Sequence, residues 1–252
     1  MARLRYPFVA VPLVVVLIYL FSLGFYAPSS YNDAISEVSD PLLVSNDTST
    51  RILLVSALFP LPHSKHTHEE YRKWLSNFLT RISTSDIYFY TTPDLEPLVR
   101  GLHANASTTT RLTVDTTYTS PLLVPPLLPY QEKYTQMHEW DREKARHSPE
   151  LYAVWNAKPW FLDSAVRNVT EEYDYAFWVD AGSFRHEHAY RRWPDARRVE
   201  EVWDDAYRMS RKGGLRGKGS LMFIPAFGLP GKAQFTWSKE RGPVDIDFSE
   251  GA

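Results

Sequence analysis

The alternation of strand and helix patterns after residue 50 is the feature that most constrains the fold. Residues 51–58 (RILLVSAL) are a run of β-branched residues and leucines, typical of a strand buried on both faces. Apolar side chains then recur every three or four positions between residues 71 and 82, which predicts an amphipathic helix with Thr67 as its N-cap. Residues 86–91 (DIYFYT) form a second strand pattern. A strand, helix and strand of these lengths form a βαβ unit, so the two strands are predicted to be parallel.

The same alternation continues along the rest of the chain. We predict helices at 94–102, 130–146, 150–168 (interrupted by Pro159) and 196–211, and strands at 111–116, 173–179 and 220–224. The four prolines within 121–129 exclude a regular helix there and predict an extended connection. This order of elements predicts an α/β fold with a mainly parallel sheet and helices on both faces.

One predicted strand ends in residues that suit ligand binding. The run YDYAFWVDAG (173–182) is apolar and aromatic until it reaches Asp180, which is followed by Ala181 and Gly182. Ligands of open α/β sheets collect at the carboxyl ends of the strands, so Asp180 is a candidate to hold a metal ion or a ribose. The alternative is that Asp180 and Gly182 only form a turn.

Two cations close to this strand are candidate phosphate ligands. Lys158 lies in WNAKPW (155–160), where Pro159 suits the first turn of a helix. Lys158 is therefore predicted at a helix amino terminus, which binds phosphate through free amides. Arg185 follows Gly182 by three residues and has donors that suit a diphosphate or a sugar hydroxyl. The alternative for both is an ordinary solvent-exposed charge.

Histidines form two further candidate groups. His63, His66 and His68 have spacings that a loop could fold around zinc, although a polar entry to a helix also explains them. Residues 186–188 (HEH) could supply metal ligands or a general base, but neighbouring side chains on a strand point to opposite faces. A metal-dependent hydrolase is therefore a third functional alternative.

The start of the chain predicts a membrane anchor. Residues 6–32 contain no charge, and 8–26 are almost wholly apolar, which is long enough to cross a bilayer. Arg3 and Arg5 precede this stretch, so the amino terminus is predicted in the cytosol. A cleaved signal peptide is the alternative, disfavoured by the bulky residue and the proline that flank the candidate cleavage site. We predict a cytosolic tail (1–5), a transmembrane signal anchor (6–27), a flexible stem (28–50) and a lumenal body (51–252).

Composition agrees with a body in the secretory pathway. Asn46, Asn105 and Asn168 each begin an N-glycosylation sequon. The chain has no cysteine, which excludes disulfides, thiolate metal sites and cysteine nucleophiles. Its net charge of −2 lacks the basic surplus that a nucleic-acid partner would require.

Several motifs together resemble a known family. They are LVSALFP (54–60), EEYRKWLSNFL (69–79), DIYFYTT (86–92), VWNAKPWFL (154–162) and YAFWVDAGSFR (175–185). On these residues the chain resembles the HtrL/YibB-like group of glycosyltransferase-like proteins, in a fungal membrane-anchored form, over roughly 51–250.

The resemblance implies a GT-A-like, Rossmann-like fold that binds a nucleotide sugar. In such folds an Asp-x-Asp motif ends a strand and binds a divalent metal, Mn or Mg, that bridges the diphosphate. Asp180 takes the place of the first acid, whereas Gly182 replaces the second. Asn156, Lys158 and Arg185 would complete the nucleotide-sugar site. Similar proteins continue past residues 247–251, so the lumenal domain is expected to be incomplete.

The function implied is that of a type II membrane glycosyltransferase-like protein of the secretory pathway, in the Golgi. It would transfer a sugar from a nucleotide-sugar donor to an unknown glycan or protein acceptor. The main alternative is a non-catalytic lumenal protein that binds carbohydrate or nucleotide through a degenerate glycosyltransferase fold.

The predicted topology can be tested in eukaryotic cells. We expect the chain to stay in the membrane fraction after alkaline carbonate extraction, because its anchor spans the bilayer. We also expect glycosidase treatment to lower its apparent mass, and Asn105→Gln and Asn168→Gln each to remove one step of that shift. Release by carbonate together with no glycosidase-sensitive mass would contradict this topology.

Overall fold

The computed structural model of the chain describes residues 50–82, 84–106, 109–188, 190, 192–210, 221–223, 232–236 and 238–241. The predicted tail, the anchor, almost all of the stem and the first sequon, at Asn46, lie outside these residues. Within the described ranges, no helix is long and apolar enough to cross a membrane.

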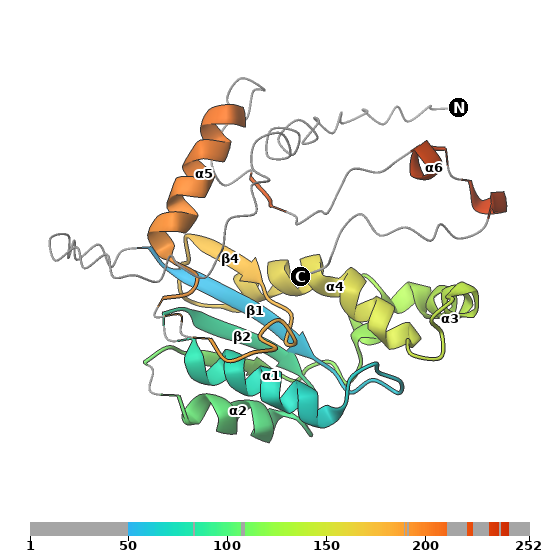
Figure 1. Cartoon of the computed structure of the whole chain (residues 1–252), viewed down its shortest axis with the longest axis horizontal. Helices are drawn as coiled ribbons and strands as arrows, with labels where there is room; N and C mark the ends of the chain where they lie inside the picture. The colour runs from blue at the N-terminus through green and yellow to red at the C-terminus, as the bar shows by residue number, and fades with distance from the viewer. Residues whose placement is uncertain are drawn as a thin grey trace, which may run out of the picture. The chain divides into compact units, whose positions relative to one another are not determined.

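Among the described residues, four parallel strands form a single sheet, which confirms the predicted α/β fold. They are β1 (Ile52–Leu58), β2 (Asp86–Thr91), β3 (Leu112–Asp115) and β4 (Tyr175–Trp178), and their order in the sheet is β3-β2-β1-β4. The arrows of β1, β2 and β4 point the same way in Figure 1, and β3 pairs with β2 in parallel. β1 therefore has a parallel neighbour on each side, with Leu54 opposite Ile87 of β2 and Phe177 of β4.

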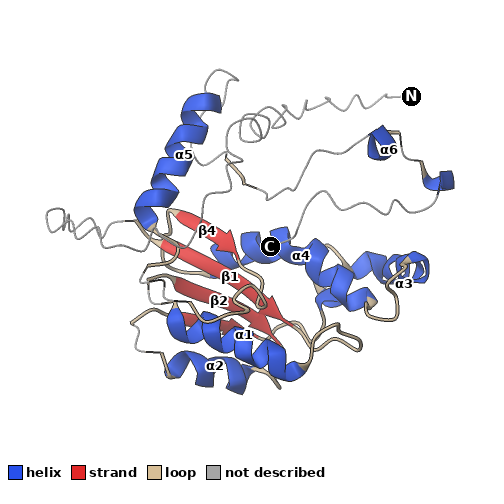
Figure 2. Cartoon of the chain, in the orientation of Figure 1, coloured by secondary structure: helices blue, strands red, loops and turns tan. Residues whose placement is uncertain are grey.

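Most of the predicted helices are present among the described residues. The described α-helices are α1 (His68–Arg81), α2 (Glu96–Ala104), α3 (Gln131–Trp140), α4 (Pro149–Asn168), α5 (Ala196–Ser210) and the short α6 (Lys232–Phe235) (Figure 2). α1 begins where the sequence predicts, because Thr67 and Glu70 form a capping box that satisfies two backbone donors.

Helices cover both faces of the sheet because strand residues alternate between two cores. Leu54 and Phe89 pack with α1 and with Val99 of α2 on one face. Leu53 and Val55 pack with Phe161 of α4 on the other. Both faces of β1 are thus excluded from water, as its continuous apolar sequence predicts.

Several local predictions differ from the structure. The helix predicted at 130–146 ends earlier, since α3 covers only Gln131–Trp140. The proline-rich stretch forms two short 3-10 turns, η2 (Pro121–Leu123) and η3 (Leu128–Tyr130), because proline suits the first turn of a helix. The prediction that Pro159 interrupts the second helical stretch is wrong, since α4 continues through this residue. Residues 221–223 are not in a strand, and their predicted strand neighbours 220 and 224 lie outside the described residues.

Asp86 joins the amino ends of the sheet. Its carboxylate accepts hydrogen bonds from the Arg111 backbone N–H at 2.8 Å and from the Tyr173 hydroxyl at 2.8 Å. The Arg51 guanidinium lies 3.4 Å from the same carboxylate. One side chain thus connects the start of β2 to the segments that lead into β1, β3 and β4.

Tyr173 makes the stability of this end of the sheet sensitive to pH in the alkaline range. Burial and the hydrogen bond to Asp86 raise the pKa of Tyr173 to about 12, whereas the pKa of a tyrosine in the unfolded chain is about 10. The stabilisation is therefore complete below about pH 10 and is lost as the pH rises toward about 12. We expect Tyr173→Phe to reduce the slope of unfolding free energy against pH in that window. Tyr130→Phe, at an exposed tyrosine, is the control, and an unchanged slope in Tyr173→Phe would contradict this role.

Candidate functional site

The strand order places a topological switch point between β1 and β4. The chain leaves β1 for β2 on one side, and after β3 it returns to pair β4 on the other side of β1. α1 covers one sheet face and α4 covers the other. In open α/β sheets such a topological switch point is where ligands bind, outside the carboxyl ends of the strands. Asp180 lies two residues beyond the end of β4, at this edge.

Asp180 is held by two side chains at the end of β4. Its Oδ2 lies 2.9 Å from Lys158 Nζ, and its Oδ1 accepts a hydrogen bond from the Trp178 indole N–H at 2.6 Å. Side chains two apart on an extended chain share a face, so Asp180 continues the face of Trp178 toward α4. Lys158 reaches the same point from the middle of α4.

The three side chains form a partly buried polar group with an open edge. The Lys158 side chain is 10% exposed and the Asp180 side chain 30% exposed. The ammonium also lies 5.9 Å from the Trp178 ring centroid, and that ring stacks on Phe161 of α4. An ammonium so poorly hydrated needs a partner, which Asp180 provides, while the more exposed carboxylate stays within reach of a ligand.

The predicted setting of Lys158 at a helix amino terminus is wrong. α4 begins at Pro149, and Lys158 lies ten residues into its sequence of 20 residues, directly before Pro159. The proline rule for first turns fails because the packing of Ala157 and Phe161 against the sheet holds the helix together around Pro159. Lys158 can thus contribute its own charge to an anion, but no free helix amides.

Gly182 and Arg185 lie against α1 rather than against Lys158. A Cβ atom at Gly182 would be 3.3 Å from Trp74 Cε3 of α1. The Arg185 guanidinium stacks over the same indole, 5.0 Å from the ring centroid, and is itself exposed. The loop after β4 is fixed there by Phe184, which stacks on Phe78 of α1. The predicted site residues thus divide into an α4 group and an α1 group on the two sides of β4's end.

Asn156 and the described sequons are at the surface. The Asn156 amide donates to the Tyr134 hydroxyl of α3 at 3.0 Å, and no contact with Asp180 accompanies it among the described interactions. Asn105 and Asn168 are both exposed, at the ends of α2 and α4. Exposure is the property that a glycan acceptor requires.

Two of the candidate histidines, His66 and His188, take part in local packing, whereas His63, His68 and His186 are exposed. His66 lies edge-on to Trp74 with ring centroids 4.7 Å apart, and its Nδ1 is 3.6 Å from Glu70. His188 contacts the Asn77 carbonyl at 3.2 Å, and burial lowers its pKa. In the parts of the chain that the structure describes, no three His, Asp or Glu side chains are grouped to hold a metal ion.

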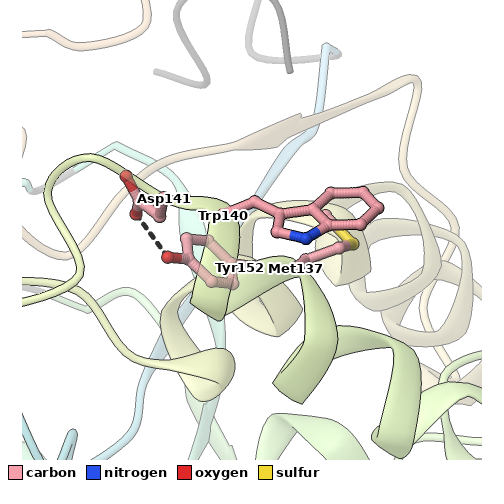
Figure 3. Close-up of a pocket in the computed structure, with 4 residues that line it drawn as sticks. All are labelled: Met137, Trp140, Asp141 and Tyr152. Carbon is pink, nitrogen blue, oxygen red and sulfur yellow. Dashed lines mark hydrogen bonds between the residues drawn. The ribbon is translucent and has the colours of Figure 1, made fainter. Parts of the chain in front are cut away.

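A small hollow lies between α3 and α4. It has a volume of about 200 Å³ and is lined by Met137, Trp140, Asp141 and Tyr152 (Figure 3). A larger hollow of about 850 Å³ lies around Tyr173 and Asp174, at the end of the sheet opposite to Asp180. Neither is lined by Asp180 or Lys158, and the larger one is at the amino ends of the strands, where α/β folds do not bind their ligands.

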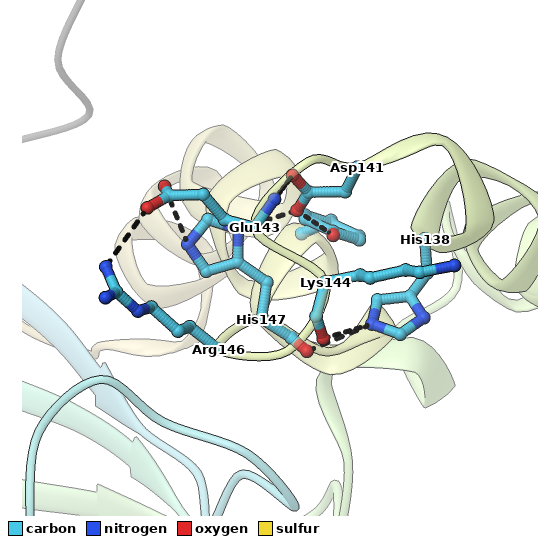
Figure 4. A network of polar contacts seen from close by, with 7 residues as sticks. His138, Asp141, Glu143, Lys144, Arg146 and His147 are labelled. Carbon is cyan, nitrogen blue, oxygen red and sulfur yellow. Dashed lines mark hydrogen bonds and ion pairs between the residues drawn. The ribbon is translucent and has the colours of Figure 1, made fainter.

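The turn between α3 and α4 is closed by a polar network (Figure 4). Asp141 accepts from the Glu143 backbone N–H at 2.8 Å and from the Tyr152 hydroxyl, and it lies 2.6 Å from His147 Nδ1. Burial alone would raise the pKa of Asp141, but these hydrogen bonds outweigh it and hold that pKa below its usual range. His138 Nε2 lies 3.0 Å from two carbonyl oxygens, so this nitrogen carries a proton. The network fixes the start of α4, the helix that carries Lys158.

Sequence reasoning missed two tryptophans that shape the site. Trp178 was part of the strand motif, and its spacing of two residues from Asp180 is the signal that would have placed both on one face. Trp74 was assigned only to the apolar stripe of α1, and no sequence signal pairs it with Gly182 or Arg185.

Comparisons with protein-family models, with curated proteins and with solved structures found no significant match. The family assignment therefore stays a prediction from the sequence motifs.

The hydrogen bond from Trp178 to Asp180 can be tested by a change that removes the indole N–H but keeps an aromatic side chain. We expect Trp178→Phe to lower the free energy of unfolding by about 1 to 2 kcal/mol, because a charged acceptor loses its donor while the stacking on Phe161 remains. Urea unfolding of the full chain measures this. Trp140→Phe, at a residue that is 54% exposed, should change stability by less than about 0.5 kcal/mol. Equal losses in both variants would contradict the role of the indole N–H.

Proposed function

We propose that this protein is a glycosyltransferase-like enzyme that binds a nucleotide-sugar donor at the carboxyl edge of β1 and β4. The observation that carries the proposal is the Asp180–Lys158 pair at the switch point of a parallel sheet, partly open to solvent. This position favours a nucleotide site over the alternative in which Asp180 only forms a turn, because a turn does not require an ammonium group beside its aspartate.

The chemistry of the pair suits the two parts of such a donor. A carboxylate accepts hydrogen bonds from ribose hydroxyls, and the exposed part of Asp180 is available to do so. Sugar transfer breaks the bond between the anomeric carbon and the diphosphate, so negative charge develops on the leaving group. Lys158, which is paired with Asp180, and Arg185, on the loop that follows β4, are the two cations proposed to neutralise that charge.

The GT-A-like architecture and the membrane topology are part of the same proposal. A parallel sheet covered on both faces is compatible with this fold class, and the motifs of residues 175–185 are what suggest it. The proposed location is a secretory-pathway membrane, the Golgi, with the described residues in the lumen. The proposed acceptor is a glycan or a protein.

A binding protein without turnover is the second candidate, and Gly182 favours it. The acid that completes an Asp-x-Asp motif is absent at this position, and a Cβ atom there would crowd the Trp74 indole, 3.3 Å from its Cε3. Release of free nucleotide from the donor in the presence of an acceptor mixture separates the enzyme from the binding protein.

Replacing the aspartate tests the donor site. We expect Asp180→Asn to weaken binding of a uridine- or guanosine-diphosphate sugar by about tenfold, because the amide lacks the charge that holds Lys158 in place. Isothermal titration calorimetry on the full chain in detergent measures the dissociation constant, and thermal unfolding confirms that the variant is folded.

Asp163→Asn is the matched control. Asp163 is an exposed residue of α4 whose partner, Arg167, is also exposed, so affinity should not change. Equal heat signals for the wild type and Asp180→Asn would count against the site, and an absence of binding by the wild type would remove the proposed function.

A further inference from the structure

We propose that the Lys158 ammonium takes the place of a divalent cation in this site, so that the chain binds a nucleoside diphosphate without metal. This inference rests on the proposed function and specifies the chemistry of the same site. It departs from the divalent metal, Mn or Mg, that the resemblance implies for Asp180.

Asp180 offers a poor donor set for a metal ion. One of its oxygens accepts the Trp178 indole N–H at 2.6 Å, and the other lies 2.9 Å from the Lys158 ammonium. A metal bound to the second oxygen at about 2.1 Å would lie within about 5 Å of a fixed positive charge on the same oxygen. Like charges that close repel strongly in a partly buried site, so the metal would have to displace the lysine.

The lysine is not easily displaced. Its side chain is 10% exposed, it extends from the middle of α4, and the Trp178 ring lies 5.9 Å from its ammonium. If a metal displaced the ammonium, this poorly hydrated group would lose its carboxylate partner, which costs free energy. The ammonium is therefore a built-in cation on Asp180.

The position of the missing second acid is crowded by packing. A Cβ at Gly182 would lie 3.3 Å from Trp74 Cε3 and 3.6 Å from Tyr71 Cε1. A side chain at this position would therefore require the indole of α1 to shift by a few tenths of an ångström. The loss of the second acid and the presence of the ammonium point the same way, since both remove what a metal needs at this edge.

The Asp180–Lys158 pair can bind a phosphate with the same alternation of charges as a metal site. In a metal site a carboxylate binds a cation, and the cation binds a phosphate. An ammonium has three N–H donors, so one lysine can bridge a carboxylate and a phosphate oxygen. Lys158 supplies one positive charge where a metal ion would supply two, and the exposed guanidinium of Arg185, on the loop after β4, is a second cation.

Calorimetry with uridine diphosphate and guanosine diphosphate tests the inference. Each titration of the full chain is run once in EDTA and once in excess Mn²⁺. We expect the wild type to bind one of the two equally well in both conditions. We expect Lys158→Ala to bind it about tenfold or more weakly in EDTA and to regain affinity in Mn²⁺, because the metal can then occupy the vacated position on Asp180.

Three further variants make the result specific. The double variant Lys158→Ala, Asp180→Ala should not be rescued by Mn²⁺, whereas Lys158→Arg should keep metal-free binding. Lys144→Ala, at an exposed lysine paired with Glu139, should behave as the wild type. Thermal unfolding in each case shows whether the variant is folded, and Lys158→Arg carries the test if Lys158→Ala does not fold.

The outcomes separate the inference from the proposed function. Binding by the wild type that requires Mn²⁺ overturns the metal-free inference and leaves the nucleotide site intact. Binding in EDTA that Lys158→Ala does not weaken also overturns it. Absence of wild-type binding in both conditions overturns the proposed function, and the inference with it.

Discussion

The burial of β1 on both faces is the constraint on which the rest of the structure depends. Leu54 and Val55 are adjacent on this strand, face opposite sides, and are both fully buried. A strand of this kind needs a layer of helices on each side, and parallel neighbours need long crossovers, which supply those helices. The chain therefore leaves β1 through α1 on one face and returns to β4 through α4 on the other, which puts the switch point beside Asp180.

Elements whose signals are local could be predicted from the sequence. α1 is the clearest example, because its cap, its acidic first turn and its apolar stripe all lie within residues 67–82. β1 and β2 were equally accessible, since few other structures accommodate such compact apolar runs. Pro159 shows the limit: a proline usually marks a helix start, but contacts of Ala157 and Phe161 with the distant sheet decide that α4 continues.

The candidate site divides in the same way. The end of a strand identifies Asp180, and sequence alone suffices for that. Its partners depend on tertiary structure: Lys158 is 22 residues away along the chain, and only the packing of α4 on the sheet brings its ammonium to the carboxylate. The sequence predicts Arg185 in the same site as Lys158, because one residue precedes and the other follows the same strand. The stacking of Phe184 on Phe78 instead directs the loop after β4 toward α1.

The Asp86 network gives the two edges of the sheet different freedom to change during evolution. One carboxylate links the starts of the four strands, so their relative positions are fixed at the end of the sheet away from the residues that follow them. Loops after β1 and β4 can therefore accept substitutions or insertions without strand slippage. New ligand specificities can arise at that edge while the scaffold beneath it keeps its geometry.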